Sequence, residues 1–252
     1  MKRVFITGAS SGIGRALALA YAKKGGTLGL AARRLDILRE IAEECSSIGG
    51  TPFIYQLDVQ DAKKCKSVAE QYMIDSGGID IAIANAGIGG DDDLFSGNSK
   101  KINTILNTNL LGVTNILFPF LPTMKNQKSG VIVCISSVAS FTPLPYHGGY
   151  TGSKIAIRML FDSWRPRLDK YNIKSVSICP GFIDTPIVKG SARRFPMKSA
   201  YEAATQFVDV IDRRHSTYVY PWPYKILILI IRLTPERFYN WLIKKIFSKP
   251  IN

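Results

Sequence analysis

Cysteine and histidine are scarce in this chain of 252 residues, which has four cysteines and two histidines. The cysteines contain no Cys-x-x-Cys pair, and their spacing from the histidines does not suit a metal site. The sequence therefore predicts no bound metal, and reduced thiols rather than a disulfide framework, as in a cytoplasmic protein. Cys134 and Cys179 lie in apolar runs and are expected in the core.

Long apolar runs are also missing. Ile226–Ile231, the run in the tail, is far shorter than the roughly 20 residues that a helix needs to cross a bilayer. Met1–Ile6 has the pattern of a strand followed at once by glycines, which does not fit a signal peptide. We therefore expect no membrane span and no secretion.

Acidic residues are too few to balance the basic ones, since 19 Asp and Glu accompany 33 Lys and Arg and the net charge is +14. Such an excess suits nucleic acid, an anionic membrane surface or a phosphorylated ligand. The basic residues are spread along the whole chain and aromatic residues do not interleave with them in any patch. Nucleic-acid binding is therefore not expected.

Short apolar strands alternate with helical stretches. The alternation predicts an α/β fold, with a Rossmann-like doubly wound parallel sheet, helices on both faces and a C-terminal helical extension. Residues 1–223 are predicted to form one domain and 224–252 a basic, amphipathic tail. The predicted strands are Val4–Thr7, Thr27–Ala32, Phe53–Asp58, Ile79–Ala84, Gly130–Ile135 and Lys174–Cys179. The predicted helices are Arg15–Lys24, Leu35–Cys45, Ala62–Met73, Lys100–Phe118 and Tyr150–Tyr171, the last with a bend or break near Pro166.

Tyr150 and Lys154 are spaced to lie on one face of a helix, and Ser137 follows an apolar strand upstream. A lysine one turn away favours the phenolate, which predicts a lowered pKa for the tyrosine. Such a tyrosine exchanges a proton with a substrate oxygen, which the serine hydroxyl holds in place. Tyr-x-x-x-Lys alone is a weak signal, because two ordinary helix-surface residues give the same pattern. Ser136 has the same chemistry, but strand alternation favours Ser137.

A glycine-rich loop separates the first strand from the first helix. Its spacing, Gly-x-x-x-Gly-x-Gly, comes from Gly8, Gly12 and Gly14, with Ser10, Ser11 and Ile13 between them. Such a loop lets backbone amides approach a pyrophosphate at a helix N-terminus, although a plain glycine turn has the same pattern.

The second strand ends at Ala32, where folds that bind NAD(H) place an acidic residue for the ribose hydroxyls. Arg33 and Arg34 follow instead, and arginine suits a phosphate. We therefore predict NADP(H) rather than NAD(H), with a solvated basic turn as the alternative.

Taken in order, these motifs resemble the short-chain dehydrogenases/reductases, in their compact single-domain form, over roughly residues 2–215. Asp58-Val59 resembles the adenine-contacting pair of that family, and Asn85-Ala86-Gly87 its motif after the fourth strand. The nicotinamide-lining segment corresponds to 180–185, which contains Pro180, Gly181, Ile183 and Thr185. The catalytic set corresponds to Asn109, Ser137, Tyr150 and Lys154.

The resemblance implies a role for each of these residues. Tyr150 is the general acid in ketone reduction or the base in alcohol oxidation, and Lys154 lowers its pKa and binds the nicotinamide ribose. Ser137 holds the substrate oxygen, and Asn109 holds a water that relays protons to Lys154. Plainer interpretations stay open: Asn109 caps or kinks its helix, Asp58 closes a strand, and His147 is a loop histidine rather than part of the substrate mouth. The resemblance also implies a homodimer or homotetramer.

Two segments bear on the substrate. Residues 186–200 correspond to the family's lid and combine Arg193 and Arg194 with Phe195 and Met197, which suits an amphipathic or anionic substrate or only a solvated loop. The tail, 224–252, predicts a last helix that begins at Thr234-Pro235-Glu236, has Phe238, Trp241, Leu242 and Ile246 on one face, and carries Arg237, Lys244, Lys245 and Lys249. Such a tail packs on the body, on a second subunit, or on the cytoplasmic face of a membrane.

The sequence thus predicts an NADP(H)-dependent oxidoreductase that interconverts a ketone or aldehyde and an alcohol on a hydrophobic or amphipathic substrate. A 3-oxoacyl thioester reductase is the alternative within this class. A catalytically silent NADP(H)-binding protein or a membrane-surface interaction protein is the alternative from another class.

Overall fold

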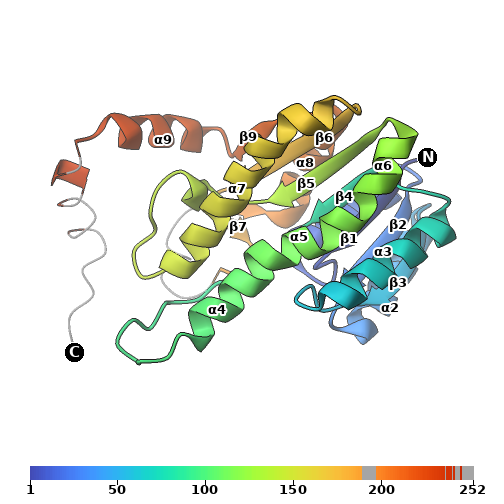
Figure 1. Ribbon diagram of the computed structural model, residues 1–252, viewed down its shortest axis with the longest axis horizontal. Coiled ribbons are helices and arrows are strands. Elements are labelled where there is room, and N and C mark those ends of the chain that lie inside the picture. The colour runs from blue at the N-terminus through green and yellow to red at the C-terminus, as the bar shows by residue number, and fades with distance from the viewer. Residues whose placement is uncertain (189–196, 236, 240, 242–244, 246–252) are drawn as a thin grey trace.

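The computed structural model describes residues 1–188, 197–235, 237–239, 241 and 245. Its centre is a parallel sheet of seven strands in the order β3-β2-β1-β4-β5-β6-β9 (Figure 1). These strands are β1 Arg3–Thr7, β2 Thr27–Ala32, β3 Thr51–Gln56, β4 Ile81–Ala84, β5 Gly130–Ile135, β6 Ile173–Pro180 and β9 Thr217–Tyr220. The predicted doubly wound α/β fold is confirmed.

Helices cover both faces of this sheet, and each face has its own core. On one face lie α1 Gly12–Ala22, α2 Leu35–Ser47 and α8 Ala200–Asp212, with Leu17, Leu30 and Phe207 buried between them and the sheet. On the other lie α3 Ala62–Ser76, the helical run from residue 100 to 127, and α7 Gly148–Asp169, around Tyr72, Phe120 and Phe161. The sequence did not predict α8 or β9. Cys134 and Cys179 are buried, as expected.

The helix predicted over Lys100–Phe118 is a composite of several helical types. It consists of α4 Lys100–Leu106, a π-helical turn Asn107–Leu111, α5 Gly112–Leu117, a 3₁₀ turn Phe118–Phe120 and α6 Leu121–Gln127. Prolines lie in the first positions of the last two pieces, where the missing amide hydrogen removes a bond to the preceding turn and the helical type changes. The composite therefore continues past the predicted end.

This composite helix meets a criterion of length and composition for a membrane span that no uninterrupted apolar run meets. Lys100–Gln127 has 28 residues and a mean hydropathy of 1.3, which is long and apolar enough to cross a bilayer by length and composition alone. A search for uninterrupted apolar runs misses this helix, because asparagine and threonine residues interrupt its apolar sequence. Val113, Ile116 and Phe120 are buried against the sheet, as in the core helix of a folded domain, whereas Leu111 and Phe118 are about half exposed.

The helix α7 is not broken at Pro166, in contrast to one of the predicted outcomes. The helix runs through the proline and ends at Asp169, so the missing amide falls in its last turn. Leu168, just beyond the proline, is buried in the core and holds that turn on the sheet.

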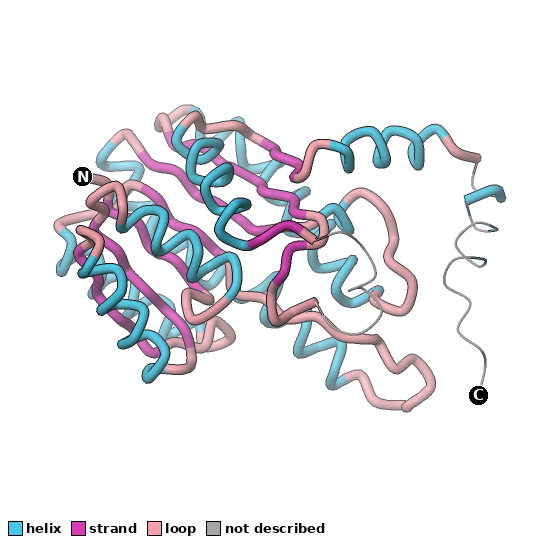
Figure 2. The backbone as a smooth tube through the Cα atoms, turned by 180° about the vertical axis from the view of Figure 1, so that it is seen from behind, coloured by secondary structure: helices cyan, strands magenta, loops and turns pink. Residues whose placement is uncertain are grey.

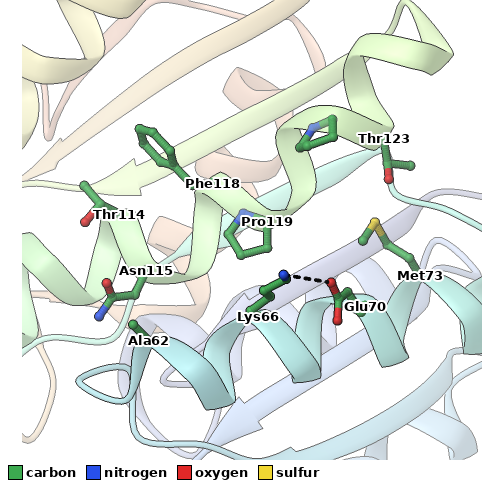
Figure 3. Close-up of a pocket in the computed structure, with 10 residues that line it drawn as sticks. Ala62, Lys66, Glu70, Met73, Thr114, Asn115, Phe118, Pro119 and Thr123 are labelled. Carbon is green, nitrogen blue, oxygen red and sulfur yellow. Dashed lines mark ion pairs between the residues drawn. The ribbon is translucent and has the colours of Figure 1, made fainter.

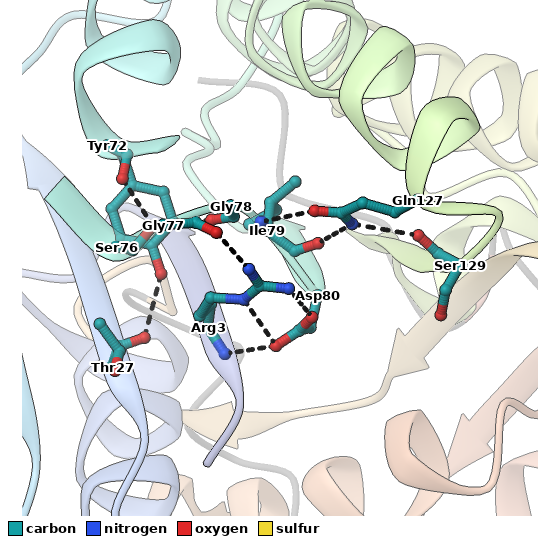
Figure 4. Close-up of polar contacts among 10 residues, drawn as sticks. All are labelled: Arg3, Thr27, Tyr72, Ser76, Gly77, Gly78, Ile79, Asp80, Gln127 and Ser129. Atoms are coloured by element: carbon teal, nitrogen blue, oxygen red, sulfur yellow. Dashed lines mark hydrogen bonds and ion pairs between the residues drawn. The ribbon is translucent and has the colours of Figure 1, made fainter. Parts of the chain in front are cut away.

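A polar network closes the amino ends of the strands, away from the site described below (Figure 4). The Arg3 guanidinium donates to both Asp80 carboxylate oxygens, at 2.6 and 3.1 Å. Burial raises the pKa of Asp80, but the hydrogen bonds from Arg3 outweigh it and hold this pKa below its usual value. Gln127 joins the network by donating to the Ile79 carbonyl at 2.7 Å.

Candidate active site

The glycine loop lies at the carboxyl end of β1, immediately before α1. Gly8 and Gly12 have φ of 65° and 53°, in the left-handed region that favours glycine. A Cβ atom on Gly14 would lie 2.3 Å from the Gly8 carbonyl oxygen, so no larger residue fits there. Ser11 at the N-cap makes no side-chain capping bond, which leaves the first amides of α1 available to an anion. The loop therefore fits the pyrophosphate of a dinucleotide. Ser10, Ser11 and Ile13, also predicted to bind the cofactor, are partly exposed along it.

The segment Asn85-Ala86-Gly87 is tied to this loop. The Thr7 hydroxyl accepts from the amides of Asn85 and Ala86, at 3.0 and 3.1 Å. The Asn85 side-chain amide donates to the Thr7 carbonyl at 2.9 Å. Two chain segments about 80 residues apart are thereby held side by side at the carboxyl edge of the sheet.

Asn109 lies within the π-helical turn and is fully buried. Its side chain accepts from the Ile88 amide at 2.8 Å and donates to the Ile88 carbonyl at 2.9 Å. It also donates to the Ser153 hydroxyl at 3.2 Å. Asn109 therefore positions the loop after β4 against α7, a role that neither interpretation predicted, and its water relay stays a prediction.

Lys154 and Tyr150 lie together on α7, beneath the end of β5. The Lys154 ammonium is buried, donates to the Ile135 carbonyl at 2.7 Å and lies 5.7 Å from the centroid of the Tyr150 ring. The Ser137 hydroxyl interacts with the Tyr150 side chain and lowers its pKa. Ser136 instead donates to the Lys154 carbonyl at 3.0 Å. The structure thus brings Ser137, and not Ser136, to the tyrosine.

The acid–base properties of this pair follow from burial. Burial raises the pKa of Tyr150 above its ordinary value, and the hydrogen bond with Ser137 offsets part of that rise. Burial also lowers the pKa of Lys154 to about 8. The shift of Tyr150 is opposite to the one predicted from Lys154, because removing the phenol from water disfavours its charged form. The tyrosine is therefore a proton donor at neutral pH.

Asp92 is a residue of the site that the sequence reading missed. It is buried and its carboxylate accepts from the amides of Gly148 and Gly149, the latter at 2.9 Å, so it caps the N-terminus of α7. Next to it, the His147 ring bonds to the Gly90 carbonyl at 2.9 Å and lies 3.4 Å from the Asp91 carboxylate. These bonds favour a structural histidine. In the sequence, this cap was indicated only by the acidic run Asp91-Asp92-Asp93 and by the lack of a capping side chain before Gly148-Gly149.

The two arginines after β2 differ. Arg34 donates to the Ser10 hydroxyl at 3.0 Å and so borders the glycine loop. Arg33 is exposed, and its guanidinium makes no hydrogen bond or ion pair with the described residues. It is available to a phosphate.

Asp58 accepts from the Gln60 amide at 3.0 Å, which closes the turn after β3 as the plainer interpretation has it. Val59 is buried and packs against Gly112. Contact with an adenine ring stays a prediction for both.

The segment 180–185 lies beside the same loop. The Ser137 hydroxyl is 3.5 Å from the Pro180 carbonyl oxygen, and Thr185 packs against Gly12. Ile183 is buried in β7 Ile183–Asp184, which pairs with β8 Lys198–Ser199. Gly181 faces the ring of Tyr224, and a Cβ atom there would lie 2.4 Å from that ring. Of the predicted lid, Arg193, Arg194 and Phe195 lie outside the described residues.

A separate groove of about 740 Å³ lies between α3 and α5–α6 (Figure 3). Lys66, Glu70 and Phe118 line it. None of the predicted catalytic or cofactor-binding residues does, so the groove is distinct from the candidate active site.

Comparisons with known proteins agree with this geometry. The family described as "short chain dehydrogenase" matches residues 2–195. An uncharacterized oxidoreductase of Myxococcus xanthus is 29% identical over 242 residues, which are 95% of each chain. The 3-oxoacyl-[acyl-carrier-protein] reductase FabG of Thermotoga maritima is 33% identical over 188 residues, 75% of this chain and 76% of its own. The structure of an alcohol dehydrogenase from the archaeon Thermococcus sibiricus, complexed with 5-hydroxy-NADP, superposes with a TM-score of 0.78 at 29% identity and covers 87% of this chain and 95% of that one.

Proposed function

The chain belongs to the short-chain dehydrogenase family of oxidoreductases, and from that premise we propose that it uses NADP(H) to interconvert a ketone or aldehyde and an alcohol on a hydrophobic or amphipathic substrate. The observation that carries this proposal is the meeting of Ser137, Tyr150 and Lys154 at the sheet edge that also holds the glycine loop. The four predicted catalytic residues and the glycine loop all lie at the carboxyl edge of the sheet.

The chemistry of this chain's own residues is proton transfer and positioning. When bound, a nicotinamide supplies or accepts the hydride. The Tyr150 hydroxyl, kept protonated by burial, donates its proton to the carbonyl oxygen in reduction. The Ser137 hydroxyl donates a hydrogen bond to the same oxygen and stabilises its developing charge. The Lys154 ammonium, fixed by the Ile135 carbonyl, stabilises the phenolate that remains.

The choice of NADP(H) over NAD(H) rests on the end of β2. Ala32 stands where an acidic residue would bind the ribose hydroxyls, and the Arg33 guanidinium is available to a 2′-phosphate. The Thermococcus relative, whose structure contains 5-hydroxy-NADP, supports the same choice.

Fluorescence titration with NADPH and NADH tests this choice. We expect NADPH to bind at least about tenfold more tightly, since a charge-assisted phosphate contact contributes about 1.5–3 kcal/mol. Arg33→Ala should remove most of that preference. Arg39→Ala, which deletes an equally exposed charge on α2, should keep it. Equal affinities for the two coenzymes in the wild type would refute the assignment.

A 3-oxoacyl thioester reductase is the second candidate, supported by the Thermotoga relative. A panel followed by NADPH absorbance separates the two, with acetoacetyl-coenzyme A against long-chain ketones and aldehydes. Faster turnover of the thioester would replace the first proposal with the second.

We place the protein in the cytoplasm, as a homodimer or homotetramer, with residues 224–252 in peripheral contact with the cytoplasmic face of a membrane. A complete absence of turnover on the substrate panel would indicate a catalytically silent NADP(H)-binding protein or a membrane-surface protein. The division at residue 223 also stays a prediction.

A further inference from the structure

The helix α9, Pro223–Leu233, leaves the body at the edge of the sheet (Figures 1 and 2). It presents an exposed apolar face. Ile226, Leu229, Ile230 and Leu233 have the i, i+3, i+4, i+7 spacing that puts them on one face of a helix. Each of them is between 51% and 76% exposed, and so is Trp222 at the start of the helix. Scattered exposed apolar residues are ordinary, but a contiguous face of large ones marks a binding surface.

The opposite side of α9 is packed on the body. Ile228 is buried in a small cluster with Cys179 and Val219, and Tyr224 and Phe141 pack against it. The helix is therefore anchored, and its apolar face points away from the protein.

The apolar face continues beyond α9. Phe238 and Trp241 are both more than half exposed, and their ring centroids are 5.5 Å apart. Leu242 and Ile246, which the sequence places on the same predicted helix face, lie outside the described residues, as do Glu236, Lys244 and Lys249. Aromatic residues therefore lie on both sides of the aliphatic stretch, at Trp222 and at Trp241.

The charge around this face favours an anionic partner. Residues 224–252 contain six basic residues and one acidic residue, Glu236; the basic residues are Lys225, Arg232, Arg237, Lys244, Lys245 and Lys249. Lys225 lies over the ring of Tyr218 and Arg232 over that of Phe141, at 5.8 and 5.5 Å from the ring centroids. These two cations therefore flank the buried side of the helix rather than its apolar face. A two-fold contact between copies would bring two such basic segments together, and like charges repel.

We propose that the outer face of α9, with Trp222, Phe238 and Trp241, docks on an anionic lipid bilayer. The aliphatic side chains enter the boundary between head groups and acyl chains, where such helices bind. Trp222 and Trp241 lie at head-group level, as indole rings do, and the basic residues of the tail beyond Arg232 meet the lipid phosphates.

This docking also brings the candidate active site to the bilayer. The Tyr239 hydroxyl bonds with the Thr142 hydroxyl at 2.8 Å and donates to the Pro143 carbonyl at 3.1 Å, in the loop before α7. Tyr224 packs on Gly181 in the segment that lines the predicted nicotinamide position. A carbonyl compound dissolved in the bilayer is therefore the substrate class that the arrangement favours. This substrate assignment rests on the proposed oxidoreductase activity, whereas the docking does not.

Co-sedimentation with vesicles tests the docking without any turnover. The full chain is mixed with vesicles of phosphatidylglycerol and phosphatidylcholine, or of phosphatidylcholine alone. We expect binding to the anionic vesicles at least about tenfold stronger, because each basic residue near the surface contributes about a fivefold gain. Ile230→Glu combined with Leu233→Glu should weaken this binding by more than about tenfold, because two apolar contacts are lost and two like charges face the lipid.

Ile74→Glu on α3 is the matched control, since Ile74 is as exposed as Leu233 but far from α9 in the sequence. It should bind vesicles as the wild type does, and coenzyme affinity should be unchanged in both variants. No binding of the wild type to anionic vesicles would overturn the proposal, and so would an equal loss in the control. A wild-type dimer that the double variant splits, with vesicle binding unaffected, would assign the face to a second copy.

A second measurement separates this proposal from the proposed function. Tyr150→Phe should bind vesicles normally and lose most of its turnover. Vesicle binding by a wild type that reduces no carbonyl would leave the docking intact and refute the oxidoreductase proposal. If both hold, the double variant should lose rate on a long-chain ketone carried in vesicles and keep it on a short, water-soluble one.

Discussion

The helices α1 and α9 have the same length, 11 residues each, and both are rich in aliphatic side chains. In α1, seven residues are buried between the sheet and α8, whereas in α9 only Ile228 is buried. The two helices also differ in side-chain size. Alanine alternates with leucine in α1, which lets the helix approach its neighbours closely, while α9 is a run of isoleucine and leucine.

The comparison shows that apolar composition tells only that a helix has to be covered, and not by what. The sheet covers α1, and the N-terminus of α1 completes the glycine loop. Only one side of α9 meets the body. Three experiments test this contrast between α1, which is part of the folded body and its site, and α9, which packs on the body with one side only.

The largest effect is expected at Tyr150. If the chemistry belongs to the body of the protein, Tyr150→Phe should lower turnover by about 10²–10⁴-fold, the usual contribution of a general acid, while coenzyme affinity stays the same. Single-turnover NADPH absorbance measures the first quantity and fluorescence titration the second. Tyr201→Phe on α8, an exposed site, is the control and should keep full activity. Retained turnover in Tyr150→Phe would show that another group supplies the proton.

Leu17→Ala and Leu229→Ala compare the two helices directly by the same change. Leu17 is fully buried, so its truncation should cost about 2–5 kcal/mol of the free energy of unfolding. Leu229 is 58% exposed, and its truncation should cost no more than about 0.5 kcal/mol. Urea unfolding measures both. Equal losses would mean that the outer face of α9 is already covered in solution, and the contrast would fail.

The third experiment concerns a residue that is buried at a cost. Burial holds the pKa of Lys154 at about 8, below its unfolded value. The unfolded chain therefore binds the lysine proton more tightly than the folded protein does, and below pH 8 this difference lowers the free energy of unfolding. Lys154→Met keeps the methylenes and removes the charge, and should stabilise the folded protein at pH 7 by about 1–3 kcal/mol. The gain should shrink as the pH rises from about 8 towards the ordinary pKa of lysine, because the unfolded chain then loses its proton too. Urea unfolding at several pH values checks this, and a destabilised variant at pH 7 would contradict it.

Much of the sheet and of the cofactor loop could be predicted from the sequence, because both depend on local patterns. Strand and helix alternation gave the doubly wound fold, and glycine spacing gave the loop whose Gly14 tolerates no Cβ atom. Strand alternation separated Ser137 from Ser136 correctly. Each of these features depends on residues close together in the sequence, so predicting it needs no knowledge of distant contacts.

Features that depend on distant contacts could not be predicted. The π-helical turn around Asn109 is fixed by its bonds to Ile88, and the rise in the Tyr150 pKa depends on how much water the fold removes. The continuity of α7 through Pro166 depends on the buried Leu168 beyond it. Tyr224 was also unexpected as the neighbour of Gly181, because nothing between residues 181 and 224 indicates that they meet.

The cap that Asp92 places on α7 has a consequence for how the protein folds. His147, the N-cap of that helix, makes no side-chain capping bond, so the cap comes from a residue 56 and 57 positions away from the amides that it receives. Closing a loop of that length costs chain entropy before the contact repays it. We therefore expect the first turn of α7, which carries Tyr150, to become ordered only after the segment following β4 has docked. On this folding route, coenzyme binding at the glycine loop becomes possible before catalysis does.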